Sequence, residues 1–468
     1  MTRFSSSSLR HCVTSSLLRF SPSSLRRFVA PSLLALLLVT SHSASAQEII
    51  YGSFTWPDRG VRIIGDPNRP DSSAVVLALA GHEDGRLYVG GYFHYAGDLG
   101  LWTPGIAVWD GQDWIAIGCN DIVGKLVSHS SGVYAGGAFT QAGGIPANRI
   151  ARWDGLAWHP LGAGTNAPVV AIEVQQGPED DPAIVYAGGA FTQAGGIPAN
   201  RIARWDGTAW SPLGQGCSSG VSSIAIYDDG SGSGSALYAT GAFQMAGGIV
   251  VNKVAKWDFQ SETWSPLGQG LAGGSGHALA VFPPPPAPGS ELHVGGYFEE
   301  VDGQPIRGVA RWNGQTWSAV GAGFNLDGDF VDVYSLKVLN DGHGAALYAA
   351  GIVDNTGFLM KWDGQSWTRY EPAPGALFDV EMYNGQLHVG GGLTEFVPKI
   401  ARFTPDGGGF GCGDFDGDGI VTQADLGILL AAFDNCPGPN CPGDANGDGV
   451  VDQQDLGILL KHFGQPCG

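Results

Sequence analysis

Basic residues are scarce in this chain: 24 Lys and Arg stand against 44 Asp and Glu, a formal net charge of −20 at pH 7. A surface of that sign repels the phosphate backbone, which argues against a nucleic-acid partner. Long apolar runs are missing too, because the run at 28–39 is shorter than the ~20 residues that a membrane-spanning helix needs. We therefore expect no membrane span.

Familiar catalytic constellations are absent as well. We find no serine nucleophile elbow between a strand and a helix, no His-Glu-x-x-His helix and no repeated Asp-box. The two carboxylates of a glycoside hydrolase remain an open alternative among the 44 acidic residues. Motifs thus assign no catalytic residue.

The first 46 residues have the composition of a secretion signal. They hold five Arg and no acidic residue, and the apolar run is followed by Ala44-Ser-Ala46, a small-residue cleavage site. Removing them leaves 19 basic and 44 acidic residues, a formal charge of −25. We expect a secreted or cell-surface protein whose mature chain begins at residue 47.

Seven cysteines are present, and Cys12 leaves with the signal. The remaining six are an even number in an exported chain, which fits disulfide pairing. Cys119 and Cys217 follow equivalent strand ends of two repeats and either bridge or stay free. The other four lie near the C-terminus; they are Cys412, Cys436, Cys441 and Cys467.

Residues 47–404 form an array of repeats, of which the clearest copies begin at Val133 and Val185. Each copy predicts four short strands: an apolar run, Leu-Tyr-Val-Gly-Gly, Ile-Ala-Arg-Trp-Asp-Gly, and a short run after a second Trp. The second strand recurs seven times at spacings of 40 to 55 residues. A repeat of this length with four strands predicts an all-β, seven-bladed β-propeller.

The seventh copy lacks a fourth strand, because its third strand leads directly into the Gly-rich segment 405–411. The stretch 60–65 is the candidate for the missing strand. A strand from the N-terminus would close the ring and remove an unpaired edge. We expect the propeller to end at 404 and a linker to occupy 405–411.

The Gly-Gly end of the second strand, the aromatic-Asp turn and the following Trp resemble the kelch repeat, most closely at 256–264. The phrase Gly-Gly-x-Phe followed by Asn-x-Ile-Ala-Arg-Trp-Asp-Gly is similar to repeats of fungal cortical cell-polarity marker proteins. Both resemblances imply a propeller and leave its activity unassigned.

Residues that recur from blade to blade are expected to be structural. The Trp-Asp pairs should place Trp between blades and let Asp cap the turn through its own backbone. We expect the recurring cations to pair with nearby carboxylates. The recurring residues are Trp109/Asp110, Trp153/Asp154, Trp205/Asp206, Trp257/Asp258, Trp362/Asp363, the second tryptophans Trp114, Trp158, Trp210, Trp264, Trp317 and Trp367, and the cations Arg152, Arg204, Lys256 and Arg311.

Residues found in one blade only are the candidates for a ligand face. Loops after the second and fourth strands should share one face around the central channel, where aromatic rings beside carboxylates and amides suit sugar binding. The alternatives are ordinary loop decoration and, at Asn325, Asp327 and Asp329, a further calcium site. The candidates are His94, Tyr95 and Trp102 of repeat one, Glu299, Glu300 and Asp302 of repeat five, and Phe324, Asn325, Asp327, Asp329 and Asp332 before repeat six.

Two acidic loops near the C-terminus have the ligand spacing of EF-hand calcium loops, with a glycine at the sharp turn. The same Asp-Leu-Gly-Ile-Leu-Leu follows both, so we expect two calcium ions. The predicted ligands of the first ion are Asp414, Asp416, Asp418, the Ile420 carbonyl, Thr422 and Asp425. Those of the second are Asp444, Asn446, Asp448, the Val450 carbonyl, Asp452 and Asp455.

Residues 412–468 resemble a type I dockerin domain. Each loop closes with Asp instead of Glu and precedes a helix without following one. The resemblance implies a small all-α domain whose helices pack through apolar stripes, at Leu426, Leu429, Leu430 and Phe433 in the first unit. It also implies adjacent chain ends, which favours Cys412–Cys467 with Cys436–Cys441; pairing within each unit is the rival.

Dockerins dock onto cohesin modules of a scaffold or cell-surface protein. In many of them loop positions 10 and 11 are Ser/Thr-like, whereas this chain has Gln423, Ala424, Gln453 and Gln454 there, with Lys461 and His462 nearby. We expect a cohesin-like partner, if present, to contact these residues.

These patterns favour a secreted binding or display protein. Its propeller would bind a glycan or a cell-surface partner, and its tail would anchor it through calcium. A polysaccharide-degrading enzyme or accessory subunit is the alternative, because dockerins in general are attached to glycoside hydrolases. A purely structural surface protein is the third hypothesis.

Overall fold

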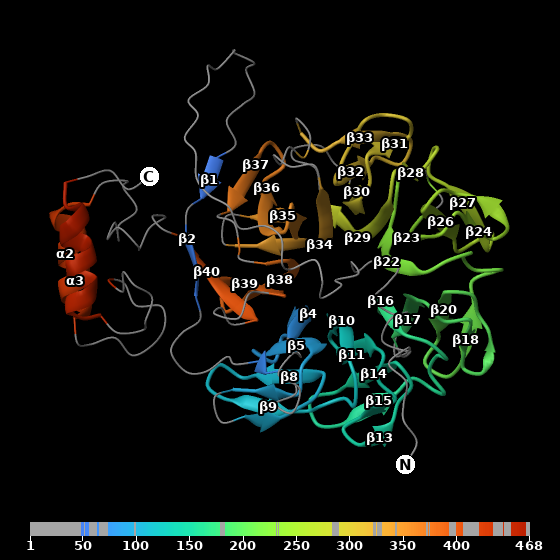
Figure 1. Cartoon of the computed structure of the whole chain (residues 1–468), viewed down its shortest axis with the longest axis horizontal. Coiled ribbons are helices and arrows are strands. Elements are labelled where there is room, and N and C mark those ends of the chain that lie inside the picture. Colours follow the sequence, from blue (N-terminus) through green and yellow to red (C-terminus); the bar gives the residue numbers. More distant parts are fainter. Residues whose placement is uncertain are drawn as a thin grey trace, which may run out of the picture.

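The computed structural model is a ring of β-sheets, and two α-helices follow in the chain (Figure 1). The signal segment, the four C-terminal cysteines, and the linker beyond Pro405 lie outside the described residues. The structure describes residues 48–50, 52–55, 63–64, 74–97, 100–177, 183–230, 232, 234–282, 290–321, 324, 330–341, 344–370, 373, 375–392, 399–405, 421–433, 443 and 451–464.

Each of the seven blades contains four antiparallel strands, the first of which lies innermost, and the blade-six sheet has a fifth strand (Figure 1). The first three blades consist of β4 (Val75–Gly81), β5 (Leu87–Tyr92), β8 (Ile106–Trp109) and β9 (Trp114–Ala116); β10 (Val123–His129), β11 (Gly132–Gly137), β14 (Ile150–Trp153) and β15 (Trp158–Pro160); and β16 (Val169–Gln175), β17 (Ile184–Gly189), β20 (Ile202–Trp205) and β21 (Trp210–Pro212).

Blades four and five consist of β22 (Val221–Tyr227), β23 (Ala236–Gly241), β26 (Val254–Asp258) and β27 (Thr263–Pro266); and β29 (Ser275–Phe282), β30 (Glu291–Tyr297), β32 (Val309–Trp312) and β33 (Trp317–Ala319). Blades six and seven consist of β34 (Val331–Asn340), β35 (Ala345–Val353), β36 (Thr356–Trp362) and β37 (Trp367–Tyr370); and β38 (Leu377–Tyr383), β39 (Gln386–Gly391), β40 (Ile400–Pro405) and β2 (Gly52–Thr55). The prediction of an all-β, seven-bladed propeller is confirmed.

The core lies between the blades. Seven apolar clusters fill the seven interfaces, and one of them joins Tyr383 and Ile400 of blade seven to Val76 and Leu79 of blade one. Burial of apolar surface therefore continues around the whole ring, including the junction where the chain does not run from one blade to the next.

Close packing accounts for the glycines at the ends of the second strands. A Cβ on Gly136 would lie 2.9 Å from Ile172 of the next blade, and one on Gly137 would lie 2.0 Å from the Ile122 carbonyl oxygen. The second contact is with the backbone, and glycine occupies this second position in all seven blades. The first position is less strict, because Thr240 and Ala350 occupy it in blades four and six.

The recurring Trp and Asp residues have the structural roles predicted for them. The indole N–H of Trp210 donates to the Leu161 carbonyl of the preceding blade at 2.8 Å, and four other second tryptophans make the equivalent bond. Asp206 accepts two backbone N–H groups of its own turn. Among the cations, Lys256 and Arg311 bind carboxylates as expected. Arg152 instead donates to the Ser131 carbonyl.

The N-terminus closes the ring, but through a different segment from 60–65. The backbone of β2 lies antiparallel to β40 and completes blade seven. Upstream, β1 (Glu48–Ile50) adds a parallel strand to β37 of blade six. The predicted segment contains β3 (Ile63–Ile64), which pairs with blade one. The prediction weighed apolar side chains, whereas closure depends on backbone groups that every residue except Pro supplies.

Small hairpins decorate one face of the ring. They join the second and third strands of blades one to four. Each hairpin of blades two to four also contacts the segment that follows the fourth strand of the preceding blade, as in the β-bridge between Cys119 and Ala142. The two kinds of loop thus share a face, as expected. The strands are β6 (Tyr95–Ala96), β7 (Leu101–Trp102), β12 (Gln141–Ala142), β13 (Ile145–Pro146), β18 (Gln193–Ala194), β19 (Ile197–Pro198), β24 (Met245–Ala246), β25 (Ile249–Val250), and, in blade five, β28 (Leu271–Ala272) with β31 (Glu300–Val301).

The tail contains α2 (Gln423–Ala432) and α3 (Gln453–His462). They share a small core in which Leu429 and Leu459 are fully buried. Leu430 is 55% exposed, so the apolar stripe is narrower than predicted. No helix among the described residues is long and apolar enough to span a membrane.

Candidate functional site

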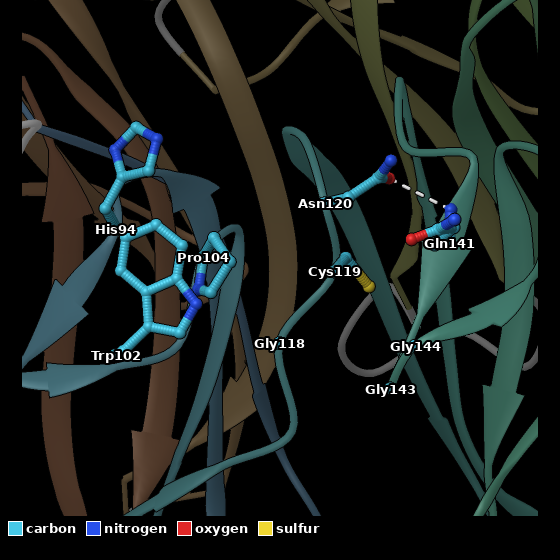
Figure 2. Close-up of a pocket in the computed structure, with 9 residues that line it drawn as sticks. All are labelled: His94, Trp102, Pro104, Gly118, Cys119, Asn120, Gln141, Gly143 and Gly144. Atoms are coloured by element: carbon cyan, nitrogen blue, oxygen red, sulfur yellow. Dashed lines mark hydrogen bonds between the residues drawn. The ribbon is translucent and has the colours of Figure 1, made fainter.

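A cavity of about 410 Å³ opens between the hairpins of blades one and two (Figure 2). Two of the predicted ligand-face residues, His94 and Trp102, form one wall of it. The lining residues are His94, Trp102, Pro104, Gly118, Cys119, Asn120, Gln141, Gly143 and Gly144.

The blade-one wall is aromatic. The β6–β7 hairpin brings the Trp102 ring to 5.6 Å from His94 and 5.1 Å from Tyr95, measured between ring centroids. Trp102 remains 57% exposed. A large exposed ring braced by two neighbours offers a flat apolar surface to a ligand without first having to be ordered.

The blade-two wall is polar and partly structural. Asn120 accepts the backbone N–H groups of Thr140 and Gln141 and donates to the Thr140 hydroxyl. Asn166 repeats this pattern in the next blade, so Asn120 belongs to the scaffold. The exposed Gln141 is the side chain best placed to bond a ligand.

The one thiol in this cavity is not activated as a nucleophile. Cys119 is 1% exposed, and burial raises the pKa of its thiol, which keeps it protonated. It is a free cysteine, as is Cys217.

Outside this cavity, the run 216–220 matches the Gly-x-Ser-x-Gly motif of serine hydrolases. It leads into strand β22 and not into a helix, and the Ser218 hydroxyl accepts backbone N–H groups.

The blade-five candidates are not gathered into a site. Glu299 and Glu300 are exposed. Asp302 accepts the Gln269 N–H at 2.7 Å and has a φ of +53°. Blades two to four have glycine at the equivalent place, as at Gly143 with a φ of +56°. Asp302 is therefore a turn residue, and its occurrence in a single blade was misleading.

The third group of candidates is divided. Phe324 is 7% exposed and packs against Phe358 and Trp367, so it is a core residue and not part of a ligand face. Its ring fills a gap between blades, which the sequence pattern could not distinguish from loop exposure. Asn325, Asp327 and Asp329 lie outside the described residues. Asp332 is buried in β34, at the edge of the channel.

Sequence reasoning missed Gln141 and the innermost-strand residue His277. Gln141 was not a candidate because Gln193 repeats it in the next blade, and only residues found in one blade were considered. His277 escaped because it lies on a predicted strand, and only loops were searched. Aligning the innermost strands with one another would have singled it out.

In the tail, four of the predicted calcium ligands are described. Asp425 and Asp455 are completely buried. Asp425 accepts the backbone N–H and the hydroxyl of Thr422, and Asp455 accepts the N–H of Asp452. The described residues contain no group of three or more His, Cys, Asp or Glu that could hold a metal. The predicted loop ligands outside them are Asp414, Asp416, Asp418, Ile420, Asp444, Asn446, Asp448 and Val450.

The predicted partner surface is described in part. Gln423, Ala424 and Gln453 are exposed at the starts of the two helices. Gln454, Lys461 and His462 lie in α3, and their side chains are outside the described set.

No protein-family model matches this chain, and no curated protein is similar to it. Solved propellers are similar at low identity. YCF48 from Cyanidioschyzon merolae is 11% identical, with 74% of this chain and 98% of that one covered and a TM-score of 0.42. The extracellular domain of the hybrid two-component system BT3049 from B. thetaiotaomicron is 11% identical over 71% of this chain and 40% of that one, with a TM-score of 0.46.

A catalytically inactive virginiamycin B lyase from Staphylococcus aureus is 15% identical, with 72% of this chain and 97% of that one covered and a TM-score of 0.41. At these values the similarities carry no argument about the activity of this protein, which has to be argued from its own residues.

Proposed function

We propose that this chain is a secreted binding or display protein. Its propeller binds carbohydrate at the blade-one cavity, and its tail binds two calcium ions and docks onto a cohesin-like module. The carbohydrate proposal rests on the exposed Trp102 ring, which lies beside His94 in a cavity of about 410 Å³ with Gln141 on the opposite wall.

The lining suits a sugar better than a charged ligand. An aromatic face packs on the apolar C–H surface of a sugar ring, and an amide such as Gln141 both donates and accepts hydrogen bonds with hydroxyls. None of the nine lining residues is acidic or basic apart from His94. Glycoside hydrolases use a pair of carboxylates, so this cavity favours binding over hydrolysis.

A glycan array and a polysaccharide panel test the carbohydrate proposal on the mature chain. Trp102→Ala should lower the affinity for the tightest-binding glycan by about 30-fold, because a Trp that becomes buried under a ligand contributes about 2 kcal/mol to binding. Leu156→Ala is the matched control, because Leu156 is 91% exposed in a turn of blade two away from the cavity. Equal affinities of the two variants would contradict the proposal.

The calcium proposal rests on the loop spacing and on the burial of Asp425 and Asp455. Each stands at the third position of its helix and turns back toward the preceding loop. The oxygen-only donor set fits a hard cation, whose charge would offset the carboxylates gathered in each loop. The hydrogen bonds between Thr422 and Asp425 also form a helix capping box, which needs no metal. A calcium-binding measurement distinguishes the two roles of Asp425.

Calorimetry of the calcium-free protein should detect two ions. Asp414→Ala and Asp444→Ala should each remove one, because each deletes a loop ligand. Gln453→Ala should keep both, since that residue is exposed and lies outside the predicted ligand set. No heat of calcium binding in the wild type would refute the proposal.

The cohesin-like partner is tested by calcium-dependent capture from cell envelopes. The two units are near-duplicates, so Arg at 423 and 424 alone should weaken capture little. Arg at all four loop positions should abolish it through clash and unpaired buried charge. Equal recovery with the fourfold variant would overturn the assigned surface.

A further inference from the structure

The seven innermost strands differ at one recurring position. Each has a β-bulge near its start, and the bulged residue lies on the innermost strand of its blade. In blades one to four these residues are Leu77, Gly124, Val170 and Ser222, whereas in blades five to seven they are His277, Tyr334 and Phe378. The scaffold thus accepts small side chains here, so the three rings are not needed to close the fold.

The rings lie in a row. The His277 ring is 6.0 Å from Tyr334, and Tyr334 is 5.0 Å from Phe378, between centroids. Two residues before the bulge in blade six stands Asp332, where the other blades have Val75, Ile122, Pro168, Gly220, Ser275 and Ala376. Blade six is the only one with a carboxylate at this described position.

One oxygen of the Asp332 carboxylate lacks a hydrogen-bond donor. Its side chain is 6% exposed, and its Oδ1 atom has no partner among the described residues. The Tyr334 hydroxyl hydrogen-bonds the carboxylate, whereas Nε2 of His277 lies 3.8 Å from Oδ1, beyond hydrogen-bond distance. The Ser275 hydroxyl lies 3.0 Å from the same nitrogen. When Ser275 donates to it, Nε2 carries no proton to offer Asp332.

This group is not a catalytic triad. A serine nucleophile needs its histidine to contact the hydroxyl through one ring nitrogen and the carboxylate through the other. Here Ser275 and Asp332 both face Nε2 of His277. The arrangement therefore offers an acceptor to a ligand and does not activate Ser275.

We propose that Asp332, His277, Tyr334 and Phe378 form a second binding site, at the mouth of the central channel, for a ligand that carries a protonated amine. The carboxylate accepts the ammonium hydrogen bonds, and the neighbouring rings present their electron-rich faces to the cation.

Charge supports this assignment. The chain is strongly acidic, which draws cations toward its surface. Burial raises the pKa of Asp332 to about 7, although a hydrogen bond from Tyr334 opposes this shift, and burial lowers the pKa of His277 to about 4. The other titratable group that faces Asp332 is Tyr334, on the same strand. An ammonium ion would pair with the carboxylate and favour its ionised form.

The experiment uses the mature chain and two amine probes, Nα-acetyl-lysine amide and glucosamine. Their neutral counterparts are the Nε-acetylated lysine and N-acetylglucosamine. We expect an amine to bind at pH 8 and its neutral counterpart to bind about tenfold or more weaker. Binding of the lysine probe alone identifies a peptide amine as the source, and binding of glucosamine alone identifies an amino sugar.

Asp332→Asn keeps the shape and removes the charge, so it should weaken amine binding by about tenfold to a hundredfold. Glu300→Gln is the matched control, because it removes an exposed carboxylate from the same face and should change little. For the lysine probe, whose amine stays protonated, affinity should fall about tenfold from pH 8 to pH 6 as Asp332 takes up a proton. Asp332→Asn should lose this dependence.

Phe378→Leu provides a second test should Asp332→Asn fold poorly, since blade one has leucine at that position. It should weaken amine binding and leave glycan binding at Trp102 unchanged. Three results would each overturn the proposal: no amine binding in the wild type, equal affinity for the neutral counterparts, or equal losses in Asp332→Asn and Glu300→Gln. A loss of glycan binding alone would bear only on the blade-one cavity.

Discussion

Lys337 joins three blades at the point where the ring closes. Its ammonium donates to the Leu79 carbonyl at 2.8 Å, to Asp379 at 2.9 Å and to Glu381 at 3.0 Å. Asp379 also accepts the Leu79 N–H and the Ser335 hydroxyl. Burial alone would lower the pKa of Lys337, but the two carboxylates outweigh it and raise the pKa. The side chain is therefore charged, paired and bonded across the junction of blades six, seven and one.

Replacing Lys337 with Met should be strongly destabilising. The change leaves Asp379 and Glu381 without their cation, and breaking a buried ion pair costs about 3 kcal/mol or more. Thermal unfolding should show a clear drop in the melting temperature. Lys125→Met is the control, because Lys125 lies on β10 of blade two, makes no direct ion pair to a described residue, and interacts with Asp379 and Glu381 only at longer range. A drop of the same size in both variants would contradict this role.

Asp332 should make stability fall as the pH rises. Its pKa in the folded chain, about 7, exceeds the value near 3.9 of an unfolded Asp. The folded state therefore binds more protons between these values, and stability decreases from about pH 4 to pH 7. Asp332→Asn should melt higher than the wild type at pH 8 and alike at pH 4. An unchanged melting temperature at pH 8 would mean that burial of the charge costs little.

At the residue level, the structure brings together two of the side chains that the sequence singled out as unusual and near a loop. His94 and Trp102 were found because blades two to five have nothing aromatic there, and the hairpin does bring them together. Asp302 and Phe324 were equally unusual in sequence, yet one caps a turn and the other fills the core. Uniqueness cannot tell these roles apart, because burial is set by neighbours in other blades.

At the scale of elements, the sequence predicted that the second strands end at the Gly-Gly doublets, but it did not predict the packing contact that explains the glycines. Repetition showed a glycine at the second position of the strand end in every blade, whereas the contact that requires it lies outside that strand. The bulges of the innermost strands were not predicted either, because their extra residue has no sequence signature. As a result, the channel-mouth residues were missed.

Gly137→Ala should destabilise the propeller by about 1–3 kcal/mol, as overpacking does, since the new methyl group would lie 2.0 Å from the Ile122 carbonyl oxygen. Gly124→Ala in the same blade should change stability by no more than about 0.5 kcal/mol, because no atom lies within 4 Å of its Cβ position. Chemical denaturation of both variants checks the contrast. Similar stabilities would show that the strand end adapts easily.

At the scale of the whole molecule, the ring depends on chain segments far apart in sequence. The repeat count predicted seven blades, and the missing fourth strand of blade seven predicted closure by the N-terminus. The prediction of which segment closes the ring was wrong. Both β2 and the segment 60–65 contain apolar residues, so composition alone does not distinguish them. Register between such short strands is decided by backbone pairing in the folded ring.

Stepwise N-terminal truncation tests this closure. Deleting residues 1–47 keeps both β1 and β2 and should melt like the mature chain. Deleting 1–51 removes β1, an additional strand on blade six, and should lower the melting temperature slightly. Deleting 1–55 removes β2 as well, which leaves β40 with an unpaired edge. That variant should melt much lower and aggregate, since exposed edges pair with other chains. Equal melting temperatures of the last two variants would show that blade seven is stable with three strands. The bonds that Lys337 makes to blades seven and one, together with the apolar cluster between these blades, would then be enough to hold the ring.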